Sequence, residues 1–471
     1  MPPRRLLEDL KRHRLPALLL AALGVRILFL FWGSVRYYGP GEARFVNGDS
    51  PSYAQSALNL LRLGRYTFDP SLPDASFGRL PGYPLFWAIH ALIFGEAGAY
   101  LAVAVSQVLL DTLGVYLIWL VARRAGGSER TAWIAAALVA FYPFSLIWIT
   151  VTGTETMGVF LCLLFLGLLT RLTTSRTALV LGAVAGVAFL PRPYLLTFLP
   201  AALAYWYASG IRGSLLANRA AMLFLAFALV YLPWPARNLL NHDRLILTKP
   251  LSAGYLHFYP DFAAFRAWVY AWQPGLEPYH RQVIGGTAPM DFPPGIFADE
   301  EERAEADRLI SRGYACGTGF RTWMNLSPTV PPCDTEVAAG FQALRSSYME
   351  RHPVRGWIVV PALNLRKAVF KSALDRSWSR PGLGDLGAQA LFLVRTALVL
   401  LGFAGIVAFR RTPAVVAVAA VSLPIYLAYA WVFRQIEMRY LIQADVLLLL
   451  PAAMALAAIV DRLGDRGGAV E

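Results

Sequence analysis

Residues 48–84 read GDSPSYAQSALNLLRLGRYTFDPSLPDASFGRLPGYP and follow the first long apolar segment of the chain. The stretch places an acid, Asp49, close to the end of that segment and a base, Arg79, just before the next apolar run. Between Ser52 and Leu63 the apolar residues recur three and four positions apart, which is the spacing of an amphipathic helix lying in a membrane interface. The pattern therefore predicts a loop that holds an acid and a base at one face of a membrane.

The composition is that of a polytopic membrane protein. Of the 471 residues, 57% are hydrophobic and 15% are charged, and the mean hydropathy is +0.48. Soluble domains usually carry about 25% charged residues. The formal charge of +13 is spread over short loops at alternate ends of the apolar segments, as membrane topology requires. Nucleic-acid binding is therefore not predicted from this charge.

Ten segments are predicted to cross the bilayer, because an apolar run of about 20 residues spans the hydrocarbon core as a helix. The first, residues 16–32, is followed by a poor cleavage site and is interpreted as a retained helix. The apolar run from Pro84 to Phe94 is too short to span and is predicted to be interfacial or re-entrant. The other nine spans are expected at about 98–121, 131–150, 155–170, 178–191, 194–209, 219–234, 388–409, 413–432 and 440–460.

The distribution of basic residues predicts the orientation of these helices. The segment ends assigned to the cytoplasm carry 16 Lys and Arg residues against six acidic residues, and such an excess marks the cytoplasmic side. Both termini are then cytoplasmic, as expected for a multi-pass protein of the cytoplasmic (inner) membrane. The loop around Asp49, the polar region 236–385 and the turn Phe433–Arg439 share the outer face, which is periplasmic or extracellular.

The chain divides into three predicted regions. Residues 1–235 form an N-terminal transmembrane module with a first outer loop at 34–97, and residues 386–471 form the C-terminal transmembrane helices and a short tail. Residues 236–385 contain no spanning stretch and half of the 30 acidic residues, so they are predicted to be a soluble, mainly helical outer insert. Cys316 and Cys333 lie in this insert; in an extracytoplasmic setting they form either a disulfide or two free thiols.

Ionisable residues collect at the outer ends of the predicted helices, where they are candidates for function. They are Asp49, Arg79, Glu155, Arg192, Arg237, Arg434, Glu437 and Arg439. Two of the acids also fit a simpler structural role. Asp49 precedes Ser50 and Pro51, a common helix start, and Glu155 ends Thr152-Gly-Thr-Glu, the pattern of a capping box. A cap also fixes a carboxylate in place, so both roles stay open.

The arginines have comparable alternatives. Arg79 lies in a stiff turn rich in Pro and Gly, where its planar guanidinium suits phosphate oxygens; alternatively its side chain snorkels to the interface. Of Arg434 and Arg439, which flank Glu437, one is expected to be structural. No CxxC or HxxH pair occurs, so the sequence predicts no zinc site.

Five motifs resemble those of the GT-C superfamily of membrane glycosyltransferases, in particular bacterial relatives of protein O-mannosyltransferases and of the lipid A aminoarabinose transferase. They lie between residues 48 and 451 in the order expected for the family and read GDSPSYAQSALNLLRLGRY, FGRLPGYPLFWAIHALIFG, TGTETM, PWPARN and EMRYLIQADVLLLLP. The resemblance implies an all-α polytopic GT-C-like fold with about ten transmembrane helices, interfacial helices in the first outer loop, and a helical outer insert.

The resemblance also implies roles for individual residues. Asp49 matches the catalytic base of the first outer loop, and Glu155 matches a second acid that binds sugar or acceptor. The residues that match lipid-phosphate ligands are Arg79, Arg192, Arg237 and Arg439, with Asn238, Tyr83, Tyr440 and Glu437 in support. Family members often carry two adjacent acids at the first position, whereas here Ser50 follows Asp49. No metal ligand and no cofactor are therefore assigned, and a requirement for a divalent metal is left open.

The activity implied is transfer of a sugar, with inversion, from a polyprenyl-phosphate-linked donor to a hydroxyl of a lipid, glycan or protein acceptor. Two other functions compete with it. A transporter or flippase of lipid-linked saccharides would carry charges deep in several spans and related halves, whereas the spans here are predicted to be almost free of charge. A lipid-binding assembly factor without catalysis is the third alternative.

Overall fold

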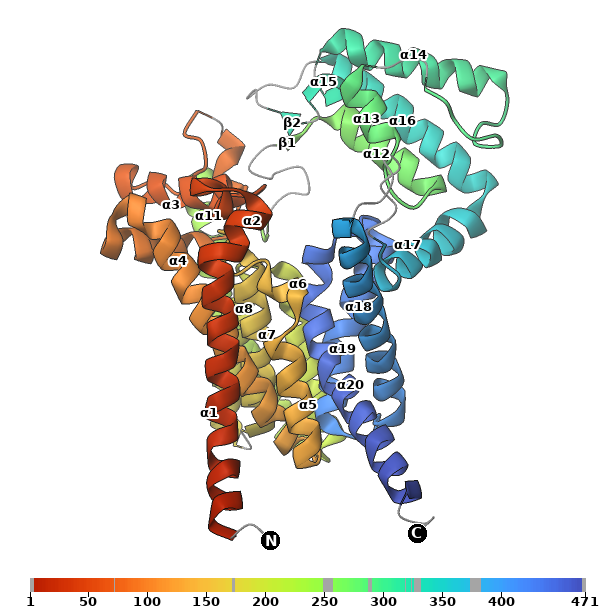
Figure 1. Cartoon of the computed structure of the whole chain (residues 1–471). Helices are drawn as coiled ribbons and strands as arrows, with labels where there is room; N and C mark the ends of the chain where they lie inside the picture. Colours follow the sequence, from red (N-terminus) through yellow and green to blue (C-terminus); the bar gives the residue numbers. More distant parts are fainter. Residues whose placement is uncertain are drawn as a thin grey trace.

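A computed structural model of the chain (Figure 1) shows a bundle of long helices with a second helical body at one end. The start of α1 and the end of α20 lie at the opposite end of the bundle from that body. The structure describes residues 4–71, 73–171, 174–248, 257–286, 290–317, 319–322, 324–325, 332–372 and 383–467.

The bundle is assembled from both ends of the chain. Its N-terminal part contains α1 (Arg4–Leu28), α2 (Ser34–Tyr38), α3 (Ser50–Leu63), α4 (Gly82–Arg124), α5 (Glu129–Ala140), α6 (Pro143–Leu146), α7 (Thr154–Arg171), α8 (Ser175–Phe189), α9 (Phe198–Ala208), α10 (Gly213–Tyr231) and α11 (Pro233–His242). Its C-terminal part contains α18 (Leu383–Ala408), α19 (Pro413–Leu427) and α20 (Met438–Gly467).

Seven helices in the described part of the chain are long and apolar enough to cross a membrane: Arg14–Tyr38, Gly82–Arg124, Thr154–Arg171, Gly213–His242, Gly384–Ala408, Pro413–Phe433 and Met438–Leu463. Each coincides with a predicted span. The three remaining predicted spans fall on shorter helices. Those at 178–191 and 194–209 overlap α8 and α9, whereas the span at 131–150 is wrong in its second half, because α5 ends at Ala140 and the short α6 follows. The all-helical membrane fold is thus confirmed, because apolar chain in lipid must satisfy its backbone hydrogen bonds within helices.

Helix α4 is two helices joined at a kink. Gly95 has φ 71° and ψ 167°, a conformation that only glycine adopts without strain. The segment before the kink is exposed at Leu92, Ile93 and Phe94. The kink therefore separates a short apolar segment, where an interfacial run was predicted, from the spanning helix that follows.

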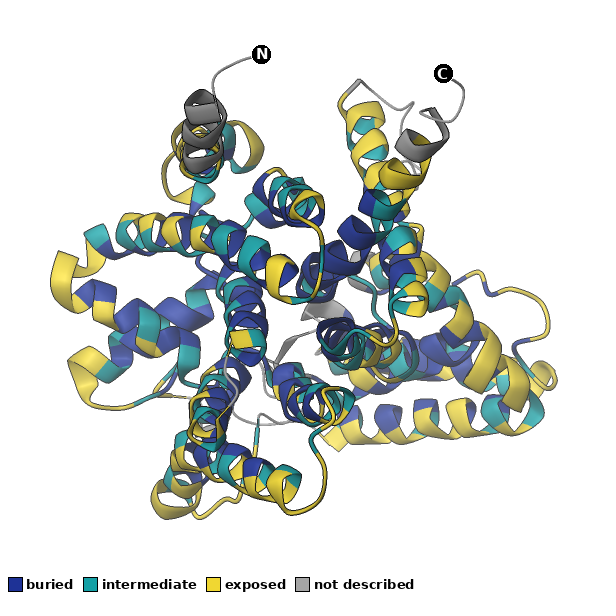
Figure 2. Ribbon diagram, turned by 90° about the horizontal axis from the view of Figure 1, so that it is seen from below, coloured by how far each residue is buried: buried dark blue, intermediate teal, exposed yellow. Residues whose placement is uncertain are grey.

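Glycines bring two pairs of helices into close contact. A β-carbon at Gly182 of α8 would lie 2.2 Å from the backbone oxygen of Leu223 on α10, and Gly186 is equally crowded by Val230. Gly405 of α18 approaches the backbone oxygen of Pro451 on α20 in the same way. Small residues at such crossings allow the tight packing on which membrane helices depend. Seen from below, buried residues face the interior and exposed ones the periphery (Figure 2).

Two ion pairs lie inside the bundle, so the prediction of spans almost free of charge is wrong. Arg26 of α1 contacts Asp111 of α4 at 2.6 Å, and Arg395 of α18 contacts Asp445 of α20 at 2.7 Å. Both arginines also donate to backbone carbonyls, Arg26 to Ala140 at 3.0 Å and Arg395 to the carbonyls of Ala368 and Val369. Each charge is neutralised by a partner from another helix, which a linear sequence does not display.

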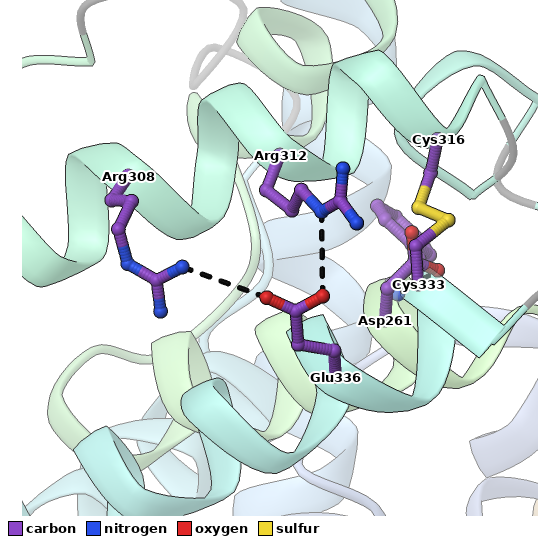
Figure 3. Close-up of a disulfide and its surroundings, with 7 residues drawn as sticks. Asp261, Arg308, Arg312, Cys316, Cys333 and Glu336 are labelled. Carbon is purple, nitrogen blue, oxygen red and sulfur yellow. Dashed lines mark hydrogen bonds and ion pairs between the residues drawn. A yellow bond between two sulfur atoms is a disulfide. The ribbon is translucent and has the colours of Figure 1, made fainter.

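The outer insert has a core of its own. It contains β1 (His257–Phe258), α12 (Pro260–Trp272), α13 (Tyr279–Gly285), α14 (Glu300–Cys316), α15 (Gly319–Thr322), β2 (Met324–Asn325), α16 (Pro332–Arg351) and α17 (Val360–Val369). The two short strands pair antiparallel. Aromatic side chains from Phe262 to Tyr348 form the core. A disulfide joins Cys316 to Cys333, and Arg312 of α14 bonds Glu336 of α16 beside it (Figure 3).

The limits of this body differ from the predicted insert. Helix α11 continues from the membrane bundle to His242, beyond the expected boundary at 235. At the other end, Ala368 and Val369 of α17 belong to the core of the membrane bundle. The part with a separate core therefore runs from about Phe262 to Met349, and α17 connects it to the bundle.

We expect Gly182→Ala to destabilise the protein by about 1–3 kcal/mol, the usual effect of overpacking, because the new methyl group meets the backbone of α10. The matched control is Gly24→Ala on α1, where no atom lies within 4 Å; alanine should there be neutral or stabilising. The midpoint of thermal unfolding in detergent measures both. Equal midpoints for the two variants would contradict the close crossing.

Candidate active site at the insert end of the bundle

Asp49 lies in a turn at the start of α3. The preceding Gly48 has φ 52°, which favours glycine, and the Ser50 hydroxyl bonds the backbone of Asn47 within the same turn. Asp49 occupies the N-cap position, yet its side chain makes no capping hydrogen bond. The Asp49 carboxylate therefore does not have the purely structural role of a helix cap.

The Asp49 carboxylate lies between two arginines. Its Oδ1 is 2.7 Å from Nη2 of Arg79, and its Oδ2 accepts a hydrogen bond from Nη1 of Arg439 at 3.0 Å. The side chain of Asp49 remains 40% exposed, whereas that of Arg79 is 12% exposed. Because Glu437 also pairs with Arg439, the cluster holds two acids and two arginines. It is partly open, and its two guanidinium groups present planar sets of N–H donors that suit an anion.

Arg79 is held from three sides. Its Nε donates to the hydroxyl of Ser52 at 2.7 Å, its guanidinium carbon lies 4.5 Å from the centre of the Tyr53 ring, and its Nη2 meets Asp49. Burial acts to lower the pKa of Arg79, but the attraction of Tyr53 and Asp49 outweighs it and the pKa is raised. The guanidinium is therefore fixed in position and permanently charged.

Arg439 is oriented in a similar way at the start of α20. Its Nε donates to Oε2 of Glu437 at 2.7 Å, and its Nη2 donates to the hydroxyl of Tyr440 at 2.8 Å. The Tyr440 ring in turn stacks on Tyr429 with centroids 5.1 Å apart. The predicted grouping of Arg439, Glu437 and Tyr440 with Asp49 is therefore present in the structure.

A second, buried ion pair lies near the first. Oε1 of Glu155, in the first turn of α7, is 2.7 Å from Nη2 of Arg192, and their side chains are 8% and 6% exposed. Arg192 also donates to the hydroxyl of Tyr194, which donates to Gln443 of α20 at 2.9 Å. Gln443 then donates to the backbone oxygen of Glu155. Together they form a closed polar ring linking three parts of the chain.

Tyr83 and Gln107 position the segment that leads to Glu155. The Tyr83 hydroxyl accepts from the backbone nitrogen of Gly153 at 2.9 Å and donates to Gln107 at 3.0 Å. Gln107 donates to two further carbonyls of the same segment. The hydroxyl of Thr152 is buried and has no partner among the described residues, so the capping box that the sequence suggests is not formed.

Tyr53 connects the two ion pairs. Its ring lies beside Arg79 and contacts the Tyr83 ring edge-on at 5.1 Å. Burial raises the pKa of the Tyr53 hydroxyl. The arginines of both pairs act to lower this pKa, and the acids of both pairs act to raise it. The two pairs are therefore close enough to act on one side chain, and they form the two parts of one candidate site.

Three other predicted residues mainly bond the backbone. Arg237 donates to the carbonyls of Ser76 and Tyr66 at 3.1 and 2.8 Å, and Asn238 donates to that of Ile246 at 2.9 Å. Arg434 donates to the carbonyls of Tyr270 and Gly356. Arg237 thus attaches the loop before α4 to α11, Asn238 holds the segment that follows α11, and Arg434 attaches the insert to the bundle. One of Arg434 and Arg439 was expected to be structural, and Arg434 is the one whose contacts are to backbone carbonyls.

The acids of the site do not present a set of metal ligands. Asp49 and Glu155 are each bonded to guanidinium groups, and Ser50 replaces a second adjacent acid. Within the described ranges, the one cluster of His, Cys, Asp or Glu close enough to hold an ion is Cys316, Cys333 and Asp334. Its two sulfurs are bonded to each other and are therefore not thiolate ligands.

A known family model matches one part of the chain. Residues 78–235, about a third of the chain, match the family model of dolichyl-phosphate-mannose-protein mannosyltransferases. The matched region includes Arg79, Tyr83, Glu155 and Arg192, whereas Asp49 and Arg439 lie outside it. A comparison with curated protein sequences gives no match.

Solved structures of an archaeal oligosaccharyltransferase share the fold. The oligosaccharyltransferase of Archaeoglobus fulgidus, in complex with Zn and sulfate, has a TM-score of 0.51 at 16% identity, over 95% of this chain and 50% of that one. The Archaeoglobus fulgidus oligosaccharyltransferase AglB, in complex with an inhibitory peptide and a dolichol-phosphate, has a TM-score of 0.52 at 16% identity, over 97% and 52%. ArnT from Cupriavidus metallidurans bound to undecaprenyl phosphate has a TM-score of 0.38 at 17% identity, over 93% and 78%.

This chain therefore has the fold of GT-C membrane glycosyltransferases, and the resemblance seen in its motifs is confirmed. It spans about half the length of the oligosaccharyltransferases that it matches.

We expect the two acids to differ in their effect on stability. Glu155→Gln leaves Arg192 buried without a counter-charge, which typically costs about 3–5 kcal/mol. Asp49→Asn removes a partly exposed carboxylate, and we expect a change of about 1 kcal/mol or less. Thermal unfolding of the two purified variants measures the difference. A Glu155→Gln protein as stable as the wild type would contradict a buried ion pair.

Proposed function

We propose that this protein transfers a sugar from a polyprenyl-phosphate-linked donor to a hydroxyl group of an acceptor. The observation that carries the proposal is the carboxylate of Asp49 held between Arg79 and Arg439. A GT-C fold supports the reaction class, and the family model that matches residues 78–235 is described by a dolichyl-phosphate-mannose donor.

The two arginines bind the phosphate of the donor. Each guanidinium already faces an anion, and its planar set of N–H donors matches phosphate oxygens. Tyr440 and Ser52 keep the two groups in place while their contacts to Asp49 are shared with the incoming phosphate. A structure of AglB that contains a dolichol-phosphate supports a lipid phosphate as the ligand of such a site.

We place the lipid chain of the donor in an apolar cavity between helices. The cavity has a volume of about 260 Å³ and lies between α5, α6 and α18. Tyr142, which lines the cavity, donates a hydrogen bond to Asp445 at 3.2 Å. Asp445 lies two residues after Gln443, a member of the polar ring that includes Glu155. The apolar residues that line it include Leu138, Phe141, Phe144, Leu391, Val394 and Leu398.

The reaction needs a base and a means of neutralising the leaving group. Asp49 accepts the proton of the acceptor hydroxyl while the hydroxyl oxygen bonds to the anomeric carbon. The bond from that carbon to the phosphate oxygen breaks, and its electron pair leaves with the lipid phosphate. Arg79 and Arg439 stabilise the charge that grows on the phosphate. Attack opposite to the leaving group inverts the anomeric configuration.

Glu155 and Arg192 would complete the site on the bundle side. Their buried pair lies across Tyr53 from Asp49, and the polar ring through Gln443 holds it rigid. Fixed carboxylate and guanidinium groups are suitable partners for sugar hydroxyls. We assign Glu155 to binding of the sugar or acceptor rather than to proton transfer, because its carboxylate is engaged by Arg192 in a nearly dry environment.

The alternative of a transporter or flippase is favoured by one observation, the two ion pairs inside the bundle. Arg26 donates further bonds to the carbonyls of Ala22 in its own helix and Ala140 in α5, and Arg395 donates to those of Ala368 and Val369 in α17. Both pairs therefore have the arrangement of fixed ties between helices. The experiment below separates the two functions, because a transporter moves the lipid-linked sugar but does not release free lipid phosphate.

We expect Asp49→Asn to lower the rate of sugar transfer about 10²–10⁴-fold, the usual contribution of a general base, with nearly unchanged binding of the donor. The assay uses protein reconstituted in membranes, a polyprenyl-phosphate sugar, and detection of free lipid phosphate. The matched control is Asp69→Asn, in the same loop, whose carboxylate bonds Ser71 and lies outside the site. Unchanged transfer by the Asp49→Asn protein would remove Asp49 from the mechanism.

We further propose that the site faces the outside of the cytoplasmic membrane. The support is the excess of basic residues at the opposite end of the bundle. In intact cells, a membrane-impermeant maleimide should label Glu96→Cys, which is exposed beside the Gly95 kink, and should miss Ser209→Cys, which is exposed after α9. Cys162 is buried and gives little background. Labelling of Ser209→Cys alone would reverse the orientation.

A further inference from the structure

The outer insert reaches Asp49 through a continuous series of polar contacts. Nη2 of Arg266, in α12 of the insert, donates to Oε1 of Gln435 at 3.1 Å. The Gln435 amide donates to Oε1 of Glu437. Oε2 of Glu437 accepts from Nε of Arg439 at 2.7 Å, and Arg439 donates to Asp49 at 3.0 Å. Four contacts thus join the insert to the carboxylate of the proposed base.

These contacts cross a segment with no regular structure of its own. Residues 434–437 form neither helix nor strand between the π-helical turn Ala428–Phe433 and the start of α20. Arg434, which has φ 53°, anchors the segment by donating to Tyr270 in α12 and to Gly356. The backbone of Glu437 is held by the start of α20, where its carbonyl accepts from the Tyr440 nitrogen, whereas the residues before it are anchored to the insert through Arg434 and Gln435.

We infer that Arg266 and Gln435 are positioning residues, through which the insert fixes the direction of the Arg439 guanidinium against Asp49. The inference rests on the proposed function of Asp49 and deepens it. Arg439 has rotamer freedom along its whole side chain, and Glu437 is the partner of its Nε. Gln435 holds Glu437 by one oxygen and leaves the other for Arg439. Arg266 holds Gln435 by its carbonyl and so orients the amide.

The consequence is a site whose geometry depends on docking of the insert. If Arg266 is removed, the Gln435 amide is free to rotate, and Glu437 loses the partner that sets its orientation. Arg439 then keeps Tyr440 and Asp49 but samples more than one direction. Binding of the donor phosphate should change little, because both guanidinium groups remain present. The chemical step should slow, because it depends on alignment of the charge with the leaving group.

The test is a double-mutant cycle with Arg266→Ala and Gln435→Ala in the full-length protein. Each variant should lower kcat about three- to tenfold, the effect of one lost hydrogen bond, while KM for the donor stays within twofold. The double variant should be no slower than the slower single variant, because both residues act through the same contacts. Arg266→Lys, which keeps a donor, should restore most of kcat. Multiplicative losses in the double variant would overturn the inference.

The control is Arg312→Ala, which breaks the contact with Glu336 inside the insert and should leave kcat unchanged. Amide hydrogen exchange gives a second readout that requires no activity. Exchange across residues 434–440 should be faster in Arg266→Ala than in Arg312→Ala or the wild type. Unchanged exchange there would overturn the linkage. A wild type without transfer activity would instead overturn the proposed function, and exchange would still decide the linkage.

Discussion

One carboxylate shared by two arginines holds the outer end of this molecule together. Arg79 follows Asp49 by 30 residues in the sequence, whereas Arg439 follows it by 390 residues. Their attraction to a single acid joins the first outer loop to the last helix. Two guanidinium groups would otherwise repel each other at this distance. The first loop, α20 and the insert each supply one of the contacts that keep the cluster in place.

Much of the architecture could be predicted from the sequence, because lipid leaves few choices to an apolar chain. The spanning helices, the interfacial α3 and the break before the spanning part of α4 follow from the lengths of apolar runs and from Gly95. The predicted neighbours of Asp49 could be identified because they lie in short polar motifs at the ends of helices.

Other members of the site could not be predicted in this way. Tyr194 and Gln443 join the Glu155 ring only through the crossing of α20 with the segment before α9, a tertiary contact with no local signal. The same applies to the pairs of Arg26 with Asp111 and Arg395 with Asp445, whose partners are far apart in the chain. Arginine accounts for nearly all the basic residues, so composition could not separate Arg439, which faces an acid, from Arg237 and Arg434, which mainly bond carbonyls. That distinction depends on which backbone oxygens lie within reach after folding.

The place of the insert in the chain has a consequence for how the protein is made. The N-terminal helices emerge from the ribosome first, then the insert with its disulfide, and Arg439 only with the final helix. Until that helix enters the bilayer, Asp49 lacks one of its two cationic neighbours and Glu155 lacks the ring through Gln443. A nascent chain therefore carries an unfinished cluster of charges until α20 has been made and has packed against the N-terminal helices.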